Sequence, residues 1–536
     1  MRCLPAAVLC ALLLGSSAAA APTSPASSAL ATSSASSTLV ITGHGYGHGV
    51  GMGQWGAYGY ALHGWSAERI LAHYYSGTAV GTAPTQIVRV LLQEADARVT
   101  LGSGGAWSLV DGVGQEMNLP AGPLDVPASL QIAGRTLVSP VMFTPGKQPV
   151  EVGKSAYRGG LLVVSNGRKL QVVNVVDLES YLLGVVGSEV PPTWPAAALE
   201  AQAIAARSYV LAKLETVVTA SPFSLYSDGR SQVYGGISAE TPATSKAVQA
   251  TAGKVVLYHG KVATTYFSSS SGGETAPGVD RKGRPLPYLA PVADPYDTLS
   301  PYHDWGPILV SAKAAGRALG LDAPLLDLQP AEPDSGHVTT ATAVDPEGSK
   351  TLTGLQVQSD LGLRSTWFEL GWLSFAPPVG RVPRGGTLTL AGTARGLTGV
   401  TVQMRVPGAA WQTLGPVTTD SAGAFTVQVS PVGTTWYRLA SGRVRGALIR
   451  VETGGVVTAA VGQDAVTGAV SAKAAGAPVF LDRKDGKDWI TVSTAIAGTD
   501  GTFAFRPLPT PGAYRVRCKP GHGLPVGTTS VLTISQ

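Results

Sequence analysis

The chain has 536 residues, of which 44% are apolar and 14% are charged, with 67 glycines, 38 prolines and a formal net charge of +5. This length demands several hydrophobic cores, and the composition excludes wholesale disorder and a coiled coil. The cysteines are Cys3, Cys10 and Cys518, which excludes a disulfide scaffold and a zinc site built from several cysteines. Residues 21–375 hold 22 basic and 27 acidic side chains, whereas residues 376–536 hold 16 and 7, so the positive charge belongs to the C-terminal third.

The N-terminus is typical of an export signal over residues 1–20. Arg2 precedes the apolar run 4–14, and alanines 18–20 supply the small residues of a cleavage site. The run is short for a membrane span, so a retained anchor is the weaker alternative. Residues 21–38 are rich in Ser, Ala, Thr and Pro, which predicts a flexible linker. We expect a protein that is secreted to the cell envelope or the cell wall.

Residues 39–375 mix strand and helix signals, which is typical of an α+β domain. Strands are predicted at 88–92 and 170–176, where β-branched side chains are enriched. Helices are predicted at 178–186 and 195–215.

The helix expected at 195–215 has its own start signal and apolar face. Thr193 is the expected N-cap, and Pro195 stands near the first helical position. One apolar stripe is expected along it, formed by Leu199, Ala203, Ala206 and Val210.

Residues 376–536 contain an internal repeat. Trp411 precedes Phe425 by 14 positions, and Trp489 precedes Phe503 by 14, which gives a repeat of about 78 residues. Short strands between Gly, Pro and Asp turns predict two small all-β sandwich modules, at 376–453 and 454–536. Their basic charge favours anionic wall polymers or a membrane surface as partners, although a solvated basic face explains it equally well. We expect no nucleic-acid partner.

A glycine–histidine motif runs from Gly43 to Gly56. Its alternating glycines allow the backbone to approach another segment or a ligand closely. We interpret the motif as a cleft wall in which His48 and Gln54 offer hydrogen bonds to a polar ligand. A tight hairpin is the alternative. A metal held by His44 and His48 is a weaker hypothesis, because no acidic or cysteine partner stands at a useful spacing.

Glu189 is the candidate general acid. It lies in the expected connection between the two helices, among Val186, Val190 and Trp194. An apolar setting disfavours the ionised carboxylate and raises its pKa, as general acid catalysis requires. A solvated loop glutamate is the alternative, but nearby prolines stiffen the loop and Arg207 stands on the next helix.

Several separate segments between residues 39 and 375 resemble the stage II sporulation protein D (SpoIID/LytB) family. They are ESYLLGVVGSEV (179–190), WP (194–195), AQA (201–203), AARSY (205–209), QVYGG (232–236), YFSSSSGG (266–273), LGLRS (361–365), HYY (73–75) and the glycine–histidine motif.

The resemblance implies a SpoIID-type catalytic domain that acts on peptidoglycan glycan strands as a lytic transglycosylase. The family's single catalytic glutamate falls on Glu189, and a family arginine falls on Arg207, which would orient Glu189 or stabilise charge. Tyr234 and Ser271 lie in matched motifs and are expected to bind substrate together with His48 and Gln54.

The sequence departs from the family's pattern at two points. Some members hold zinc through Cys and His, but Ser231-Gln232 and residues 267–271 supply neither, so we predict no metal and no other cofactor. The glycine–histidine motif stands at the N-terminal end of the domain, an order that is tolerable if the two ends of the domain are neighbours in the fold. Asp177 and Glu179 are close enough in sequence to keep hydrolysis open.

Two rival functions follow from the same segments. The modifier branch of the family implies a non-catalytic wall-binding protein that stimulates a wall amidase. A surface adhesin that works through its β-modules is the third hypothesis.

Overall fold

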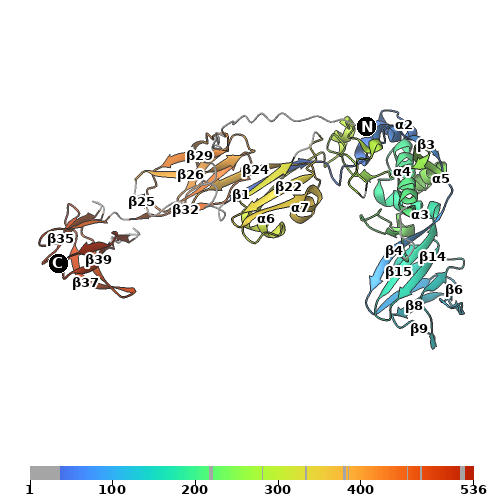
Figure 1. Cartoon of the computed structure of the whole chain (residues 1–536), viewed down its shortest axis with the longest axis horizontal. Helices are drawn as coiled ribbons and strands as arrows, with labels where there is room; N and C mark the ends of the chain where they lie inside the picture. Colours follow the sequence, from blue (N-terminus) through green and yellow to red (C-terminus); the bar gives the residue numbers. More distant parts are fainter. Residues whose placement is uncertain are drawn as a thin grey trace, which may run out of the picture.

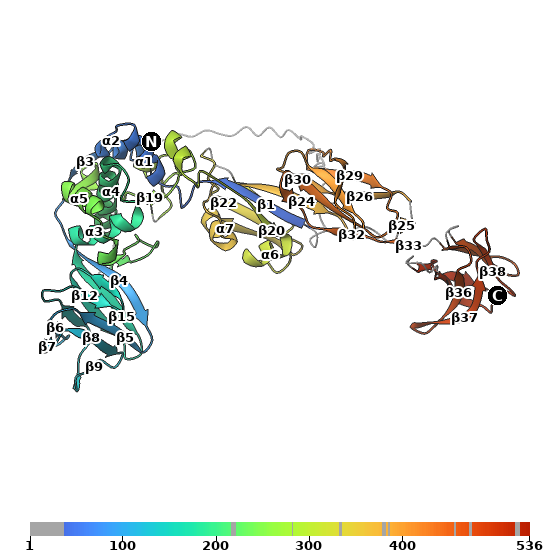
Figure 2. The ribbon, with the colours of Figure 1, turned by 180° about the vertical axis from the view of Figure 1, so that it is seen from behind.

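The computed structural model describes residues 37–215, 221–280, 282–331, 335–377, 382–383, 386–454, 457–470, 474–519 and 526–535. The predicted signal peptide and residues 21–36 of the predicted linker lie outside these ranges. Ser37 and Thr38, at the end of that linker, are instead buried in strand β1 (Ser37–His44). Within the described ranges, no helix has both the length and the apolar character to cross a membrane. The described parts form an elongated row in which the C-terminal strands lie far from helices α2 to α5 (Figures 1 and 2).

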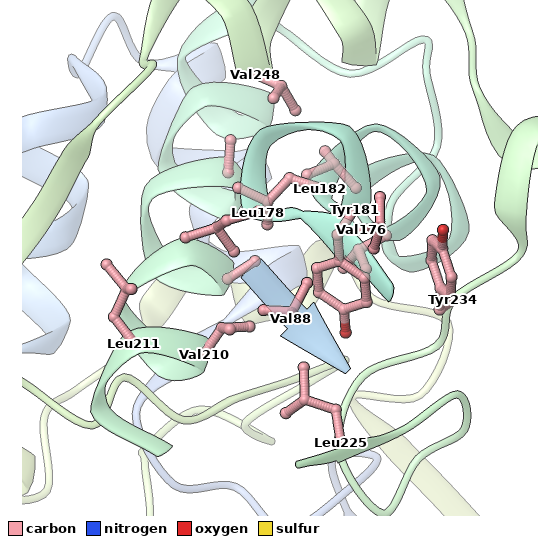
Figure 3. Close-up of a cluster of buried hydrophobic side chains, with 14 of the residues drawn as sticks. Val88, Val176, Leu178, Tyr181, Leu182, Val210, Leu211, Leu225, Tyr234 and Val248 are labelled. Carbon is pink, nitrogen blue, oxygen red and sulfur yellow. The ribbon is translucent and has the colours of Figure 1, made fainter. Parts of the chain in front are cut away.

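Five helices and a small sheet form the part that carries Glu189. The helices are α1 (Gln54–Leu62), α2 (Ala67–Tyr74), α3 (Leu178–Glu189), α4 (Ala196–Leu214) and α5 (Pro242–Ala250). The sheet has the order β18-β17-β3, with bounds β18 Lys261–Val262, β17 Lys254–Tyr258 and β3 Ala79–Thr82. Figure 3 shows the buried core in which α3, α4 and α5 meet Val88 of β4 (Ile87–Ala95) and Val176 of β15 (Leu170–Asp177).

Helix α3 begins at the predicted residue, Leu178, but its C-terminal end and the start of α4 differ from the prediction. Asp177 caps α3 by accepting a hydrogen bond from the backbone N–H of Ser180 at 2.9 Å. Glu189 is the last residue of α3, so the connection predicted to hold it begins only at Val190. The predicted Thr193 cap is wrong: α4 begins at Ala196, and its N-cap is Pro195, which has no side-chain acceptor.

Helix α4 is buried on two faces rather than on one stripe. The four predicted stripe residues pack into the core that contains α3. Ala201, Ile204 and Ala205 pack on the other side, into the core formed with α1 and α2. A helix that separates two cores needs small apolar residues all round, which explains its alanine-rich sequence.

A β-rich part, most of which precedes α3 in the chain, encloses its own core. Its first sheet has the order β16-β4-β15-β14-β11-β6-β7, with bounds Leu225–Tyr226, Ile87–Ala95, Leu170–Asp177, Gly160–Ser165, Val141–Thr144, Trp107–Val110 and Glu116–Leu119. Its second sheet has the order β13-β12-β5-β8, with bounds Ser155–Tyr157, Val150–Val152, Arg98–Ser103 and Gly122–Pro127. Strand β15 runs directly into α3, so this part fixes where the helix starts.

The two ends of the predicted 39–375 domain are neighbours, as the permuted motif order requires. Strand β1 pairs antiparallel with both β20 (Asp304–Ser311) and β24 (Phe368–Phe375). One face of these strands packs on a core with α6 (Ala312–Ala318) and α7 (Gly354–Leu361). The sheet β21-β22-β23 joins that core, with bounds Asp327–Ala331, Thr340–Asp345 and Gly348–Thr353.

The predicted boundary at residues 375 and 376 does not interrupt this sheet. Strand β24 also pairs with β26 (Leu388–Arg395), which pairs with β29 (Ala424–Val429). The second face of β1 and β24 supplies Val40, Leu373 and Phe375 to the core of the following part. One five-stranded sheet, β20-β1-β24-β26-β29, therefore belongs to two cores.

The C-terminal strands form two successive two-sheet parts. In the first, β26 and β29 share a core with a sheet of β27 (Thr401–Arg405), β28 (Gln412–Pro416), β30 (Thr435–Ser441), β31 (Val444–Arg445) and β32 (Ile449–Val451). In the second, sheet β34-β35-β38 shares a core with β36, β37, β39, β40 and β41. The bounds of β34, β35 and β38 are Val457–Val461, Val466–Val470 and Thr502–Phe505. Those of β36, β37, β39, β40 and β41 are Pro478–Asp485, Asp488–Ile496, Gly512–Cys518, Gly527–Thr528 and Leu532–Ile534.

Candidate catalytic site around Glu189

Glu189 is a partly exposed carboxyl group held from two sides. Its Oε1 accepts a hydrogen bond from the backbone N–H of Val233 at 2.8 Å, and its Oε2 accepts one from Gln54 Nε2 at 3.4 Å. Burial raises the pKa of Glu189 above its ordinary value, although both hydrogen bonds act in the opposite direction. The two hydrogen bonds thus fix the carboxyl group of a residue that is only partly buried.

Gln54 connects Glu189 to a second amide, that of Gln202, which is not among the residues predicted for the site. Gln54 is buried at the start of α1, and its Nε2 also lies 3.4 Å from Gln202 Oε1. Gln202 Nε2 is buried and has no hydrogen-bond partner within the described residues. The signal was present in the matched AQA segment, because a glutamine in the interior of a buried helix needs a polar partner.

Arg207 contacts Glu179, ten residues before Glu189 on the same helix. Its side chain is 1% exposed, and its Nε and Nη2 donate to the two Glu179 carboxylate oxygens, each at 2.7 Å. Nη1 also donates to the Lys254 carbonyl at 3.1 Å and Nη2 to the Val248 carbonyl at 3.4 Å. Arg207 therefore ties α4 to the start of α3, to α5 and to β17. Its connection to Glu189, at the other end of α3, runs through the packing of α3 on α4.

Asp177 and Glu179, which kept hydrolysis open, both have structural partners. Asp177 caps α3, and Glu179 pairs with Arg207. Ten helical residues separate Glu179 from Glu189, a rise of about 15 Å. This exceeds the spacing of about 5–10 Å at which two carboxyl groups cooperate on one glycosidic bond.

The glycine–histidine motif packs against the 266–273 segment. Met52 N–H donates to the Tyr266 carbonyl at 3.1 Å, and Tyr46 and Ser270 exchange backbone hydrogen bonds of 2.9 and 3.1 Å. Gly51 has φ +74°, and a Cβ there would lie 2.1 Å from the Tyr266 carbonyl oxygen, so no other residue fits. The motif thus approaches another segment closely, as its alternating glycines indicated.

His48 is placed within this packed segment. Its Nδ1 accepts from the Val50 N–H at 3.0 Å, and its ring lies 5.9 Å from the Tyr266 ring. Burial lowers the pKa of His48 to about 4, so the imidazole is neutral at pH 7. No hydrogen bond joins it to Glu189 within the described residues, in contrast to Gln54.

Tyr234 and Ser271 have partners inside the protein. Tyr234 is 5% exposed, donates to Asn174 Oδ1 at 2.9 Å and packs on the Tyr181 ring at 4.8 Å. Ser271 is fully buried, and its hydroxyl donates to Asp294 Oδ2 at 2.8 Å. Burial raises the pKa of Asp294 to about 7. Both matched motifs therefore hold the backbone around the site in place.

Three partly exposed aromatic rings stand beside Gln54 and the loop after Glu189. Trp55 and Tyr58 come from α1, and Trp194 comes from the loop. Their ring centroids are 4.9 to 5.7 Å apart. Trp194 was expected only to be an apolar neighbour of Glu189, although rings of this kind commonly line binding sites.

Comparison with known protein families bears on the central part of this site. Residues 166–258 match the family model SpoIID, described as Stage II sporulation protein. This segment belongs to the stage II sporulation protein D family. The resemblance expected from the motifs is thereby confirmed, and the SpoIID segment includes Glu189, Gln202 and Arg207, whereas Gln54 lies outside it.

Relatives of the SpoIID segment include three bacterial proteins. Stage II sporulation protein D of Bacillus subtilis (strain 168) is 31% identical over 214 residues, covering 37% of this chain and 62% of that protein. The amidase enhancer of the same strain is 36% identical over 143 residues, covering 27% and 19%. An uncharacterized protein of Brachyspira hyodysenteriae (strain ATCC 49526 / WA1) is 36% identical over 136 residues, covering 25% and 37%. The chain thus spans less than two thirds of the length of each relative.

Proposed function

We propose that this protein acts on peptidoglycan in the cell envelope as a lytic transglycosylase, with Glu189 as its acid and base. The family match supports a cell-wall-related function. The observation that carries the reaction type is the setting of Glu189, a carboxyl group with a raised pKa, while Asp177 and Glu179 at the start of α3 are engaged with structural partners.

The chemistry requires one group that donates a proton and then accepts one. Protonated Glu189 gives its proton to the glycosidic oxygen that leaves C1 of muramic acid. The resulting carboxylate removes the proton from the C6 hydroxyl of the same sugar, and O6 bonds to C1. The products are two strands: one ends in a free 4-hydroxyl, and the other ends in a 1,6-anhydro ring. No water is consumed. Val233 and Gln54 hold the carboxyl group during both transfers.

Product mass distinguishes this reaction from hydrolysis. The full chain is incubated with intact and with peptide-stripped sacculi, and the soluble glycans are analysed by mass spectrometry. A lytic transglycosylase releases 1,6-anhydro ends, which weigh one water less than the reducing ends left by hydrolysis. Exclusive formation of reducing ends would overturn the proposal.

The amidase enhancer similarity favours a second candidate function, a non-catalytic modifier of a wall amidase. The discriminating experiment compares the protein alone, an amidase alone and both together on the same sacculi. Glycan release by the protein alone supports catalysis. Release of stem peptides that rises only when both proteins are present supports the modifier.

The pH profile reports the protonation of Glu189. Activity is expected to fall as the pH rises through the Glu189 pKa, because the proton donor is lost, and burial places this fall above the range of an exposed glutamate. Gln54→Ala removes a hydrogen bond that favours the carboxylate, so the alkaline midpoint of kcat/KM should move to higher pH. His48 does not obscure this limb, since its pKa is about 4. An unchanged midpoint would contradict the role of Gln54.

A further inference from the structure

The outward face of the sheet that contains β27 and β30 carries a cluster of arginines and tryptophans. Arg405 pairs across the strands with Trp436, and Gln403 pairs with Arg438. The alternate residues of these strands, such as Tyr437, are buried in the core, so the named ones point outward. We call Arg405, Trp411, Trp436, Arg438 and Arg445 the Arg–Trp surface.

The guanidinium groups of this surface cover the indole rings. Arg438 lies 3.9 Å from the centroid of the Trp411 ring, and Arg405 lies 4.9 Å from Trp411 and 5.6 Å from Trp436. A guanidinium stacked on an indole keeps its N–H edges free to bind other groups. The surface therefore presents donors in fixed positions instead of bare aromatic faces.

Positive charge on this surface is not neutralised internally. The pKa of Arg438 is lowered by burial and by the charges of Arg445 and Arg405. Arg438 Nε donates to the neutral Oε1 of Gln403 at 2.9 Å. Within the described residues, no ion pair reaches these three arginines. Glu452, which directly follows β32, pairs with Arg450 at 3.1 Å.

The second C-terminal part contains the corresponding site with its charge neutralised. Asp482 pairs across the strands with Arg515, as Gln403 does with Arg438, and Arg515 lies 4.5 Å from the Trp489 ring. Asp482 is buried, and its oxygens accept from Arg515 Nε at 3.1 Å and Arg517 Nε at 3.0 Å. The repeat thus places a carboxylate in one copy and an amide in the other.

We propose that the Arg–Trp surface binds a polymer of phosphodiester-linked polyol or sugar units. Planar guanidinium groups match the paired oxygens of a phosphate. Single-stranded nucleic acid is disfavoured because its bases need bare rings for stacking, and here arginines cover the rings. Because Gln403 is neutral, the charge of Arg438 remains available to an external anion. In the other copy, the equivalent Arg515 is already paired with the carboxylate of Asp482.

Binding of poly(glycerol phosphate) to the full chain tests the proposal, measured by isothermal titration calorimetry at several salt concentrations. Wild type should bind with an affinity that falls as salt rises. Gln403→Asp should reduce the affinity about tenfold or more, because it supplies an internal partner for Arg438, as Asp482 does for Arg515. Arg405→Gln, which removes one donor without adding a charge, should weaken binding as well.

Gln428→Asp is the matched control, since it makes the same substitution at an exposed position of β29, in the other sheet. It should leave the affinity unchanged. The proposal would be overturned if Gln403→Asp and Gln428→Asp lost the same affinity, or if neither Gln403→Asp nor Arg405→Gln lost any. Tighter binding to single-stranded DNA or to phosphatidylglycerol vesicles than to poly(glycerol phosphate) would also overturn it. Because binding is measured without turnover, the result is separate from the proposed transglycosylase activity.

Discussion

Glu189→Gln is expected to reduce the release of 1,6-anhydro glycans from sacculi by a factor of about 10³ or more. Glutamine keeps the volume of the side chain and an oxygen that accepts from the Val233 N–H, but it can neither donate nor remove the required proton. The loss should appear in kcat, since Glu189 would act in the chemical step rather than in uniform substrate binding.

Glu116→Gln, at an exposed position of β7, is the matched control and should retain full activity. Thermal unfolding should be nearly the same for both variants and the wild type. Wild-type release by a correctly folded Glu189→Gln protein would remove Glu189 from the mechanism. If the Glu189→Gln variant still stimulated an amidase, this result would support the modifier function instead.

Arg207→Ala is expected to lower the free energy of unfolding by about 3–5 kcal/mol, as measured by urea denaturation. The change leaves Glu179 without its ion-pair partner and removes the hydrogen bonds that Arg207 donates to the Val248 and Lys254 carbonyls. Arg207→Lys should be nearly as damaging, because an ammonium group cannot bind both carboxylate oxygens and both carbonyls at once.

An exposed pair of the same type provides the control. Arg158 donates to both oxygens of Glu240 at 2.7 and 2.8 Å, but its side chain is 46% exposed. Arg158→Ala should therefore cost less than about 1 kcal/mol. If Arg207→Ala left stability unchanged and abolished activity, Arg207 would belong to the catalytic site and not to the helix framework.

The sequence was informative about the site where short-range chemistry decides the structure. The helix predicted at 178–186 starts at the observed first residue of α3 and ends three residues before its observed last residue, Glu189. The apolar neighbours of Glu189 predict the direction of its pKa shift, which burial produces. The alternating glycines predict a close backbone approach, which Gly51 makes to Tyr266.

Long-range pairing could not be predicted from the same signals. Arg207 stands 18 residues from Glu189 and 28 from Glu179, and only the packing of α4 on α3 decides that it meets the more distant one. Ser271 and Tyr234 belong to conspicuous motifs, yet their partners Asp294 and Asn174 lie in other segments. A polar residue in a motif does not disclose whether it faces solvent or the interior.

The sheet that continues through residues 375 and 376 decides where this protein can be cut. A fragment ending at residue 375 would leave one edge of β24 unpaired and would expose Val40, Leu373 and Phe375 to water. Free strand edges and apolar faces of this kind promote self-association. The first C-terminal part therefore cannot be removed without damage, because its strands β26 and β29 complete the sheet that contains β1. A soluble truncated form needs to retain this part.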